Sequence, residues 1–137
     1  MPKFYLNKIV RDDIFDEYSS DPTAKVDHKI LAGDELIRKL AEKVVEEAGE
    51  IASVVSEQTS ESMDLDKLTS EIADLKEVLI ALYKRCGINE EAVETKRQEK
   101  LTKKGGFNKG AYILSLELPE DHEWTEYFHS DSKYKKK

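Results

Sequence analysis

The sequence of 137 residues contains a single cysteine, Cys86. One thiol excludes an intramolecular disulfide and a thiolate-rich metal site within one chain. Long hydrophobic runs are missing as well, because the longest, residues 78–83, is far shorter than the roughly 18 residues of a membrane span. The opening residues 1–4 (MPKF) lack the apolar segment of a signal peptide. We therefore expect a cytoplasmic protein without a membrane partner.

Basic charge is scarce relative to acidic charge, with 22 Lys and Arg against 29 Asp and Glu, for a net charge of −7. Domains dedicated to DNA or RNA are normally basic, so no nucleic acid polymer is expected as a partner. Charged residues make up 37% of the chain, which exceeds the usual share of about 25%. This composition favours amphipathic helices in one compact domain.

The spacing of apolar residues predicts a mainly all-α fold. Asp34 and Asn89 are of the N-cap type, and Gly87 and the pair Gly105–Gly106 are placed to end helices. The expected helices are a short one over residues 11–18 and three long ones over residues 34–57, 64–86 and 90–104. The first two long helices have a short connection over residues 58–63, which predicts an antiparallel hairpin followed by a third helix.

Two segments with strand-like composition flank the long helices. Residues 24–31 (AKVDHKIL) and 111–118 (AYILSLEL) predict short strands that pair as a small accessory β-hairpin. The domain is therefore expected to span residues 1–118. Residues 119–137 are acidic and then lysine-rich, which is typical of a partly mobile tail.

Four acidic residues intrude on the apolar faces of the first two long helices. At about 100° per residue, Glu47 falls inside the apolar arc of the first helix and Glu50 at its edge. Glu71 falls inside the arc of the second helix and Asp74 at its margin. The midpoint between the two acid pairs coincides with the centre of the 58–63 connection. Folding the hairpin therefore brings four carboxylates together at one height.

Unpaired buried carboxylates cost several kcal/mol each, so some must be protonated or a cation must lie among them. Ligands that offer only oxygen suit Mg²⁺ or Mn²⁺, and Mg²⁺ recruits substrate phosphates. A di-iron site needs Glu-x-x-His pairs, which both helices lack. The alternative is that the acids face solvent or pair with lysines across the interface. The two acid pairs lie at the same height along the hairpin, and this match favours the cation site.

A basic stretch follows in residues 96–109, which contain six basic residues and one acid. Lys100 and Lys104 share one helical face with Arg97. Such a face next to an acidic metal groove is suited to the outer phosphates of a nucleotide. The alternative is a solvated helix end whose lysines interact favourably with the helix dipole.

Three segments together resemble the all-α nucleoside triphosphate pyrophosphohydrolases of the MazG-like superfamily. Residues 46–50 (EEAGE) and 71–74 (EIAD) match its EExxE…ExxD motif. Residues 7–12 (NKIVRD) are similar to the NKLVRDKIPE signature of the predicted house-cleaning branch, and residues 100–107 (KLTKKGGF) to its EKxxKRGGF signature. The chain departs from these signatures at four positions: Asp13, Phe15, Lys104 and Gly110.

The resemblance implies Mg²⁺-dependent hydrolysis of a nucleoside triphosphate between its α- and β-phosphates, giving a monophosphate and pyrophosphate. Mn²⁺ is the alternative ion. The implied metal ligands are Glu47, Glu50, Glu71 and Asp74. Glu46 is implied either to support these ligands without contacting the ion or to position the attacking water, and Glu46 and Glu47 are the implied catalytic pair. The implied phosphate-binding residues are Arg11, Lys8, Lys100 and Lys104.

Two other functions stay open from the sequence. Phosphoribosyl-ATP is an alternative substrate for the same chemistry, and a module that binds nucleotide without hydrolysing it is an alternative of another class. Family members bury their helix pairs in dimers or larger assemblies. The apolar area is also generous for three helices and a small hairpin, so we expect at least a homodimer, assembled as a helical bundle.

Overall fold

The computed structural model describes residues 1–56 and 59–134, and all regular structure in this part of the chain is helical. The elements are α1 (Asp12–Ser20), α2 (Gly33–Ser56), α3 (Leu65–Arg85), α4 (Glu90–Lys104), α5 (Thr125–Ser130) and a 3₁₀ helix (Ser132–Tyr134). The all-α fold class is confirmed. The expected helix end at Glu57 and the start of the connection at Gln58 lie outside the described residues. The chain divides into two compact units, Met1–Glu99 and Lys100–Lys137.

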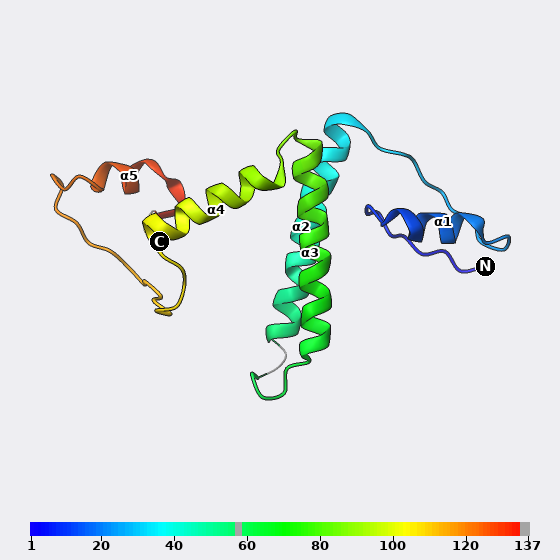
Figure 1. Cartoon of the computed structure of the whole chain (residues 1–137), viewed down its shortest axis with the longest axis horizontal. Coiled ribbons are helices and arrows are strands. Elements are labelled where there is room, and N and C mark those ends of the chain that lie inside the picture. Colours follow the sequence, from blue (N-terminus) through cyan, green and yellow to red (C-terminus); the bar gives the residue numbers. More distant parts are fainter. Residues whose placement is uncertain (57–58, 135–137) are drawn as a thin grey trace. The chain divides into compact units, whose positions relative to one another are not determined.

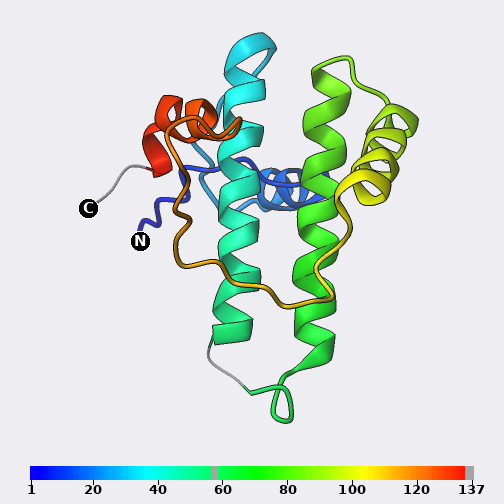
Figure 2. The same ribbon diagram turned by 90° about the vertical axis from the view of Figure 1, so that its left-hand side faces the viewer.

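The first unit is built on a hairpin of α2 and α3, which run antiparallel and pack against each other (Figure 1). Figure 2 shows the two helices side by side, connected at one end. Leu40 and Val54 of α2 are the buried hydrophobic side chains among the described residues, with 6% and 4% of their surface exposed. The predicted hairpin is confirmed.

Local signals set both ends of α3 and the start of α4. The Asp64 carboxylate accepts a hydrogen bond of 3.0 Å from the backbone N–H of Lys67, which caps α3. Asn89 does the same for α4, accepting from the backbone N–H of Ala92 at 2.7 Å. Gly87 follows α3 with a φ of 77°, a conformation that glycine adopts without strain. The predicted cap at Asp34 is wrong, because α2 begins at Gly33 and places Asp34 in its first turn.

The predicted β-hairpin is wrong. Neither residues 24–31 nor residues 111–118 are in a strand. Most of their large apolar side chains are exposed, as at Ile30 (78%) and Leu114 (89%). Composition favours an extended backbone in both segments, but a strand exists only when its N–H and C=O groups find a partner strand.

Residues 119–137 are expected to form a tail, and their described part, residues 119–134, contains two short helical elements in the second unit. Residues 135–137 lie outside the described residues. The Thr125 hydroxyl donates a hydrogen bond of 2.7 Å to the Pro119 carbonyl, and Thr125 is buried. Three aromatic rings of the same segment contact one another, with centroids 5.1 Å apart for Tyr127–Phe128 and for Phe128–Tyr134. None of the described helices is long and apolar enough to cross a membrane.

Candidate functional site

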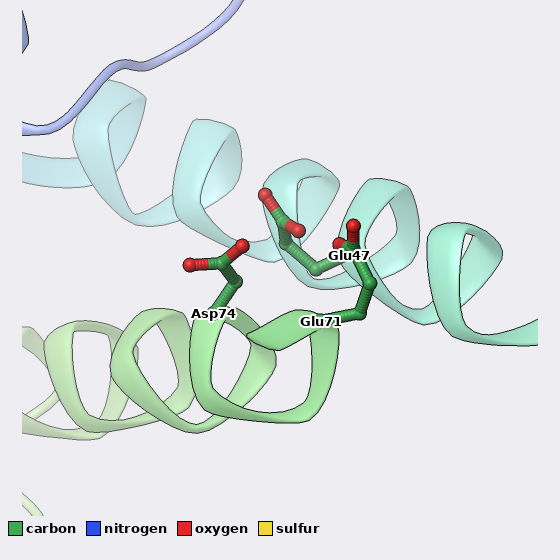
Figure 3. A group of neighbouring side chains, drawn as sticks. All are labelled: Glu47, Glu71 and Asp74. Atoms are coloured by element: carbon green, nitrogen blue, oxygen red, sulfur yellow. The ribbon is translucent and has the colours of Figure 1, made fainter. Parts of the chain in front are cut away.

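Three carboxylates converge between α2 and α3 (Figure 3). Glu47 comes from α2, and Glu71 and Asp74 come from successive turns of α3. One carboxylate oxygen of each lies within 4.8 Å of the others. Glu47 is buried, with 9% of its surface exposed, and the other two are half-buried. Three of the four acids predicted to meet are therefore brought together.

The fourth acid, Glu50, lies one turn further along α2. It is exposed, and it is not a member of the carboxylate group formed by Glu47, Glu71 and Asp74. Its role as a ligand stays a prediction. We call the group of Glu47, Glu71 and Asp74 the carboxylate triad.

Lys43 supplies positive charge from within α2. Its ammonium lies 3.3 Å from a carboxylate oxygen of Glu47 and 3.2 Å from one of Glu46. Only 14% of the Lys43 side chain is exposed, so solvent screens these ion pairs less than it screens surface pairs. Partial burial by itself raises the pKa of Glu46, but hydrogen bonds from Lys43 and Lys8 and their charges outweigh it, and the net pKa of Glu46 is lowered.

The segment before α1 reaches both helices of the hairpin. Lys8 lies 3.3 Å from Glu46 on α2, and the Arg11 guanidinium lies 2.7 Å from Asp74 on α3. Asn7 has a φ of 48°, which bends the chain just before Lys8; asparagine tolerates this left-handed conformation better than most residues. Two of the four residues predicted to contact phosphate, Lys8 and Arg11, thus pair with acidic residues at the candidate site.

The charges of the triad are incompletely neutralised. Lys43 pairs with Glu47 and Arg11 pairs with Asp74. Glu71 has no hydrogen-bond or ion-pair partner within residues 1–56 and 59–134. The three carboxylates and these two cations leave a net charge of −1, centred on Glu71.

The donor set fits a hard divalent cation. Three carboxylates from two rigid helices offer oxygen atoms alone, which is the set that Mg²⁺ and Mn²⁺ prefer. Mg²⁺ usually takes one or two protein carboxylates and completes its shell with water and phosphate oxygens, so three carboxylates are sufficient.

Lys100 and Lys104 occupy the last turns of α4 and are exposed. They belong to the second unit, and their contact with substrate stays a prediction. Lys43 is the site residue that the sequence analysis missed. Its spacing of three and four residues before Glu46 and Glu47 places all three on one helix face, which is the signal that identifies it.

Comparisons of the chain with protein-family models, with curated proteins and with solved structures gave no significant match. The three sequence motifs and the geometry of the triad are therefore the grounds for assigning a function.

Proposed function

We propose that the protein is a cytoplasmic, Mg²⁺-dependent nucleoside triphosphate pyrophosphohydrolase that clears surplus or aberrant nucleotides. The observation that carries this proposal is the meeting of Glu47 with Glu71 and Asp74, residues of the two halves of the EExxE…ExxD motif, within 4.8 Å. Such convergence of acids is costly unless a cation compensates it.

Glu47, Glu71 and Asp74 would hold the ion, with Glu50 as a further ligand if its side chain turns inward. When bound there, the ion would supply positive charge for the phosphate oxygens and would lower the pKa of a bound water, so no side-chain nucleophile would be required.

Glu46 is the residue that we assign to the attacking water. Its carboxylate is kept ionised and fixed by Lys43 and Lys8, at 3.2 and 3.3 Å. A fixed, ionised carboxylate orients the water and accepts its proton while the water oxygen adds to one phosphorus of the α–β anhydride. The anhydride bond breaks, and the products are a nucleoside monophosphate and pyrophosphate.

Release of pyrophosphate from a panel of ordinary and modified nucleoside triphosphates tests the proposal. We expect turnover with Mg²⁺ and none with EDTA. Glu47→Gln and Asp74→Asn should abolish turnover and keep the helical circular dichroism spectrum. Glu42→Gln, on an exposed turn of α2 outside the triad, is the matched control and should keep full activity. Full activity of both triad variants would contradict the site assignment.

The same panel separates the other functions. If phosphoribosyl-ATP is hydrolysed and the nucleoside triphosphates are not, phosphoribosyl-ATP is the substrate of the enzyme. Mg²⁺-dependent binding of nucleotides without any product would indicate a binding module instead.

We propose further that the enzyme is at least a homodimer, because the hairpin leaves one apolar side uncovered. In each helix, every residue that packs against the other helix is followed by a residue that lies on one side of the hairpin. Because the helices are antiparallel, this side is the same for both, and it is opposite to the side of Glu46 and Asp74. On α2 this side carries residues spaced alternately by four and three, all exposed: Ala41, Val45, Ala48, Ala52 and Val55. On α3 it carries exposed residues at intervals of seven: Leu65, Ile72 and Leu79.

Alternate spacing by four and three is the pattern by which helices of separate chains pack. Light scattering during size exclusion should therefore give at least twice the mass of 15.7 kDa. Val45→Glu should yield the monomer, whereas Lys39→Glu, on the other side of α2, should not. A monomeric wild-type protein at micromolar concentration would contradict the dimer.

A further inference from the structure

Two basic side chains contact carboxylates of the triad, and a metal ion would have to compete with them for these carboxylates. Lys43 is 3.3 Å from Glu47 and Arg11 is 2.7 Å from Asp74. The Lys43 pair is largely buried and the Arg11 pair is largely exposed. Each pair joins a cation to a carboxylate proposed to hold an ion. The chain thus fills part of its own site with positive charge.

We propose that Lys43 and Arg11 are exchangeable counter-ions that couple metal binding to polyphosphate binding: they neutralise Glu47 and Asp74 in the empty site and transfer to phosphate oxygens when a nucleotide enters with its metal ion. This inference rests on the proposed function and adds to it an order of binding, in which the site takes the metal together with the triphosphate.

The charge balance supports this coupling. The triad carries three negative charges, and Lys43 and Arg11 reduce its net charge to −1. A bare divalent ion is attracted weakly to such a site and faces two cations at close range. A triphosphate brings several negative charges, so it gives Lys43 and Arg11 new partners and leaves the carboxylates to the ion. The same residues that weaken the affinity for the bare ion therefore strengthen the affinity for the nucleotide.

The placement of the two side chains allows the transfer. Arg11 precedes α1, its side chain is 58% exposed, and its planar guanidinium binds phosphate as readily as carboxylate. Lys43 has a flexible four-carbon stem, and its ammonium already lies between Glu46 and Glu47. It keeps Glu46 as a partner when it leaves Glu47.

Lys39 provides the matched control. It lies one turn before Lys43 on α2 and pairs with Glu42 at 3.1 Å, with 45% of its side chain exposed. It is the same residue type on the same helix with the same kind of ion pair, but its partner is outside the triad. Lys39→Met removes one positive charge without touching the candidate site.

The test measures two affinities of the full chain, and the inference predicts that they change in opposite directions. Binding of Mn²⁺ alone is followed by electron paramagnetic resonance for wild type, Lys43→Met, Arg11→Met and Lys39→Met. Binding of ATP with a methylene bridge between its α- and β-phosphorus atoms is followed by calorimetry at saturating Mn²⁺. We expect Lys43→Met and Arg11→Met to bind Mn²⁺ alone about threefold to tenfold more tightly, and the ATP analogue about threefold to tenfold more weakly. Lys39→Met should change neither affinity.

The opposite signs distinguish exchange from a merely structural role. If both variants lose affinity for Mn²⁺ and for the analogue alike, Lys43 and Arg11 only hold the site together, and the inference is overturned. Unchanged Mn²⁺ affinity in both variants overturns it as well. If no form binds Mn²⁺ with or without the analogue, the proposed function fails together with the inference. Arg11 lies outside the helical hairpin, so its variant keeps the test decisive if Lys43→Met does not fold.

Discussion

Glu71 is the member of the triad without a counter-ion, and replacing it should affect the protein in opposite ways with and without metal. In Glu71→Gln one negative charge is removed at almost constant shape. Without divalent ions this substitution should stabilise the hairpin, because it removes repulsion between Glu71 and the carboxylates of Glu47 and Asp74. With Mg²⁺ present, the same substitution should weaken binding of the ion and so reduce the stability that the ion adds.

The magnitude follows from the separation of the carboxylates. Two unit charges within 4.8 Å of each other repel by about 0.9 kcal/mol at the dielectric constant of water and by about 3.5 kcal/mol at an effective constant of 20. Lys43 and Arg11 already offset part of the charge of Glu47 and Asp74. The gain in free energy of unfolding should therefore lie near the lower figure, at about 1 kcal/mol, which raises Tm by about 4 °C.

Thermal unfolding in EDTA and in Mg²⁺ measures both effects. Wild type should gain stability with Mg²⁺, by about 2.7 kcal/mol when the ion is at 100 times its Kd, and Glu71→Gln should lose most of that gain. Glu77→Gln, exposed on the same helix, is the control and should behave as wild type. A lower Tm of Glu71→Gln in EDTA, or an undiminished response to Mg²⁺, would refute the electrostatic reasoning.

Three further predictions concern the scaffold. Leu40→Ala should lower the free energy of unfolding by about 2–4 kcal/mol in urea titrations because it empties a buried site, whereas Val45→Ala, 72% exposed, should cost far less unless the dimer covers it. Asn89→Ala should cost about 1 kcal/mol of α4 stability, seen as lower helicity, because it removes the cap. Hydrogen bonds from Arg97 and then from Gln98 lower the pKa of Glu94 to about 2. The stability from this pair is therefore complete above the ordinary pKa of 4.5 and is lost as the pH falls toward 2. A carbon NMR titration should place the midpoint of Glu94 near 2 and should move it toward 4.5 in Arg97→Gln; an unchanged midpoint would contradict the assigned cause.

Local chemistry made the helices predictable. The cap at Asn89 and the glycine after α3 act within a few residues, so the sequence alone shows them. The meeting of Glu47 with Glu71 and Asp74 was predictable for a related reason. A short connection forces two helices into antiparallel contact, and helical periodicity then sets which side chains face each other.

Features that depend on distant partners were not predictable in this way. Residues 24–31 and 111–118 have the composition of strands, but pairing is a non-local property and neither segment forms one. The contact of Arg11 with Asp74 joins residues 63 positions apart, and no local pattern indicates it. The motif resemblance marked Arg11 as functional, but it gave phosphate rather than a carboxylate as the partner.

The central claim is that the carboxylate triad serves hydrolysis between the α- and β-phosphates. Phosphorus NMR of a nucleoside triphosphate incubated with the wild-type protein and Mg²⁺ tests it most directly. The predicted result is the appearance of pyrophosphate and nucleoside monophosphate in equal amounts, absent with EDTA and absent with Asp74→Asn. Release of inorganic phosphate and a diphosphate, or equal turnover by Asp74→Asn, would contradict the claim.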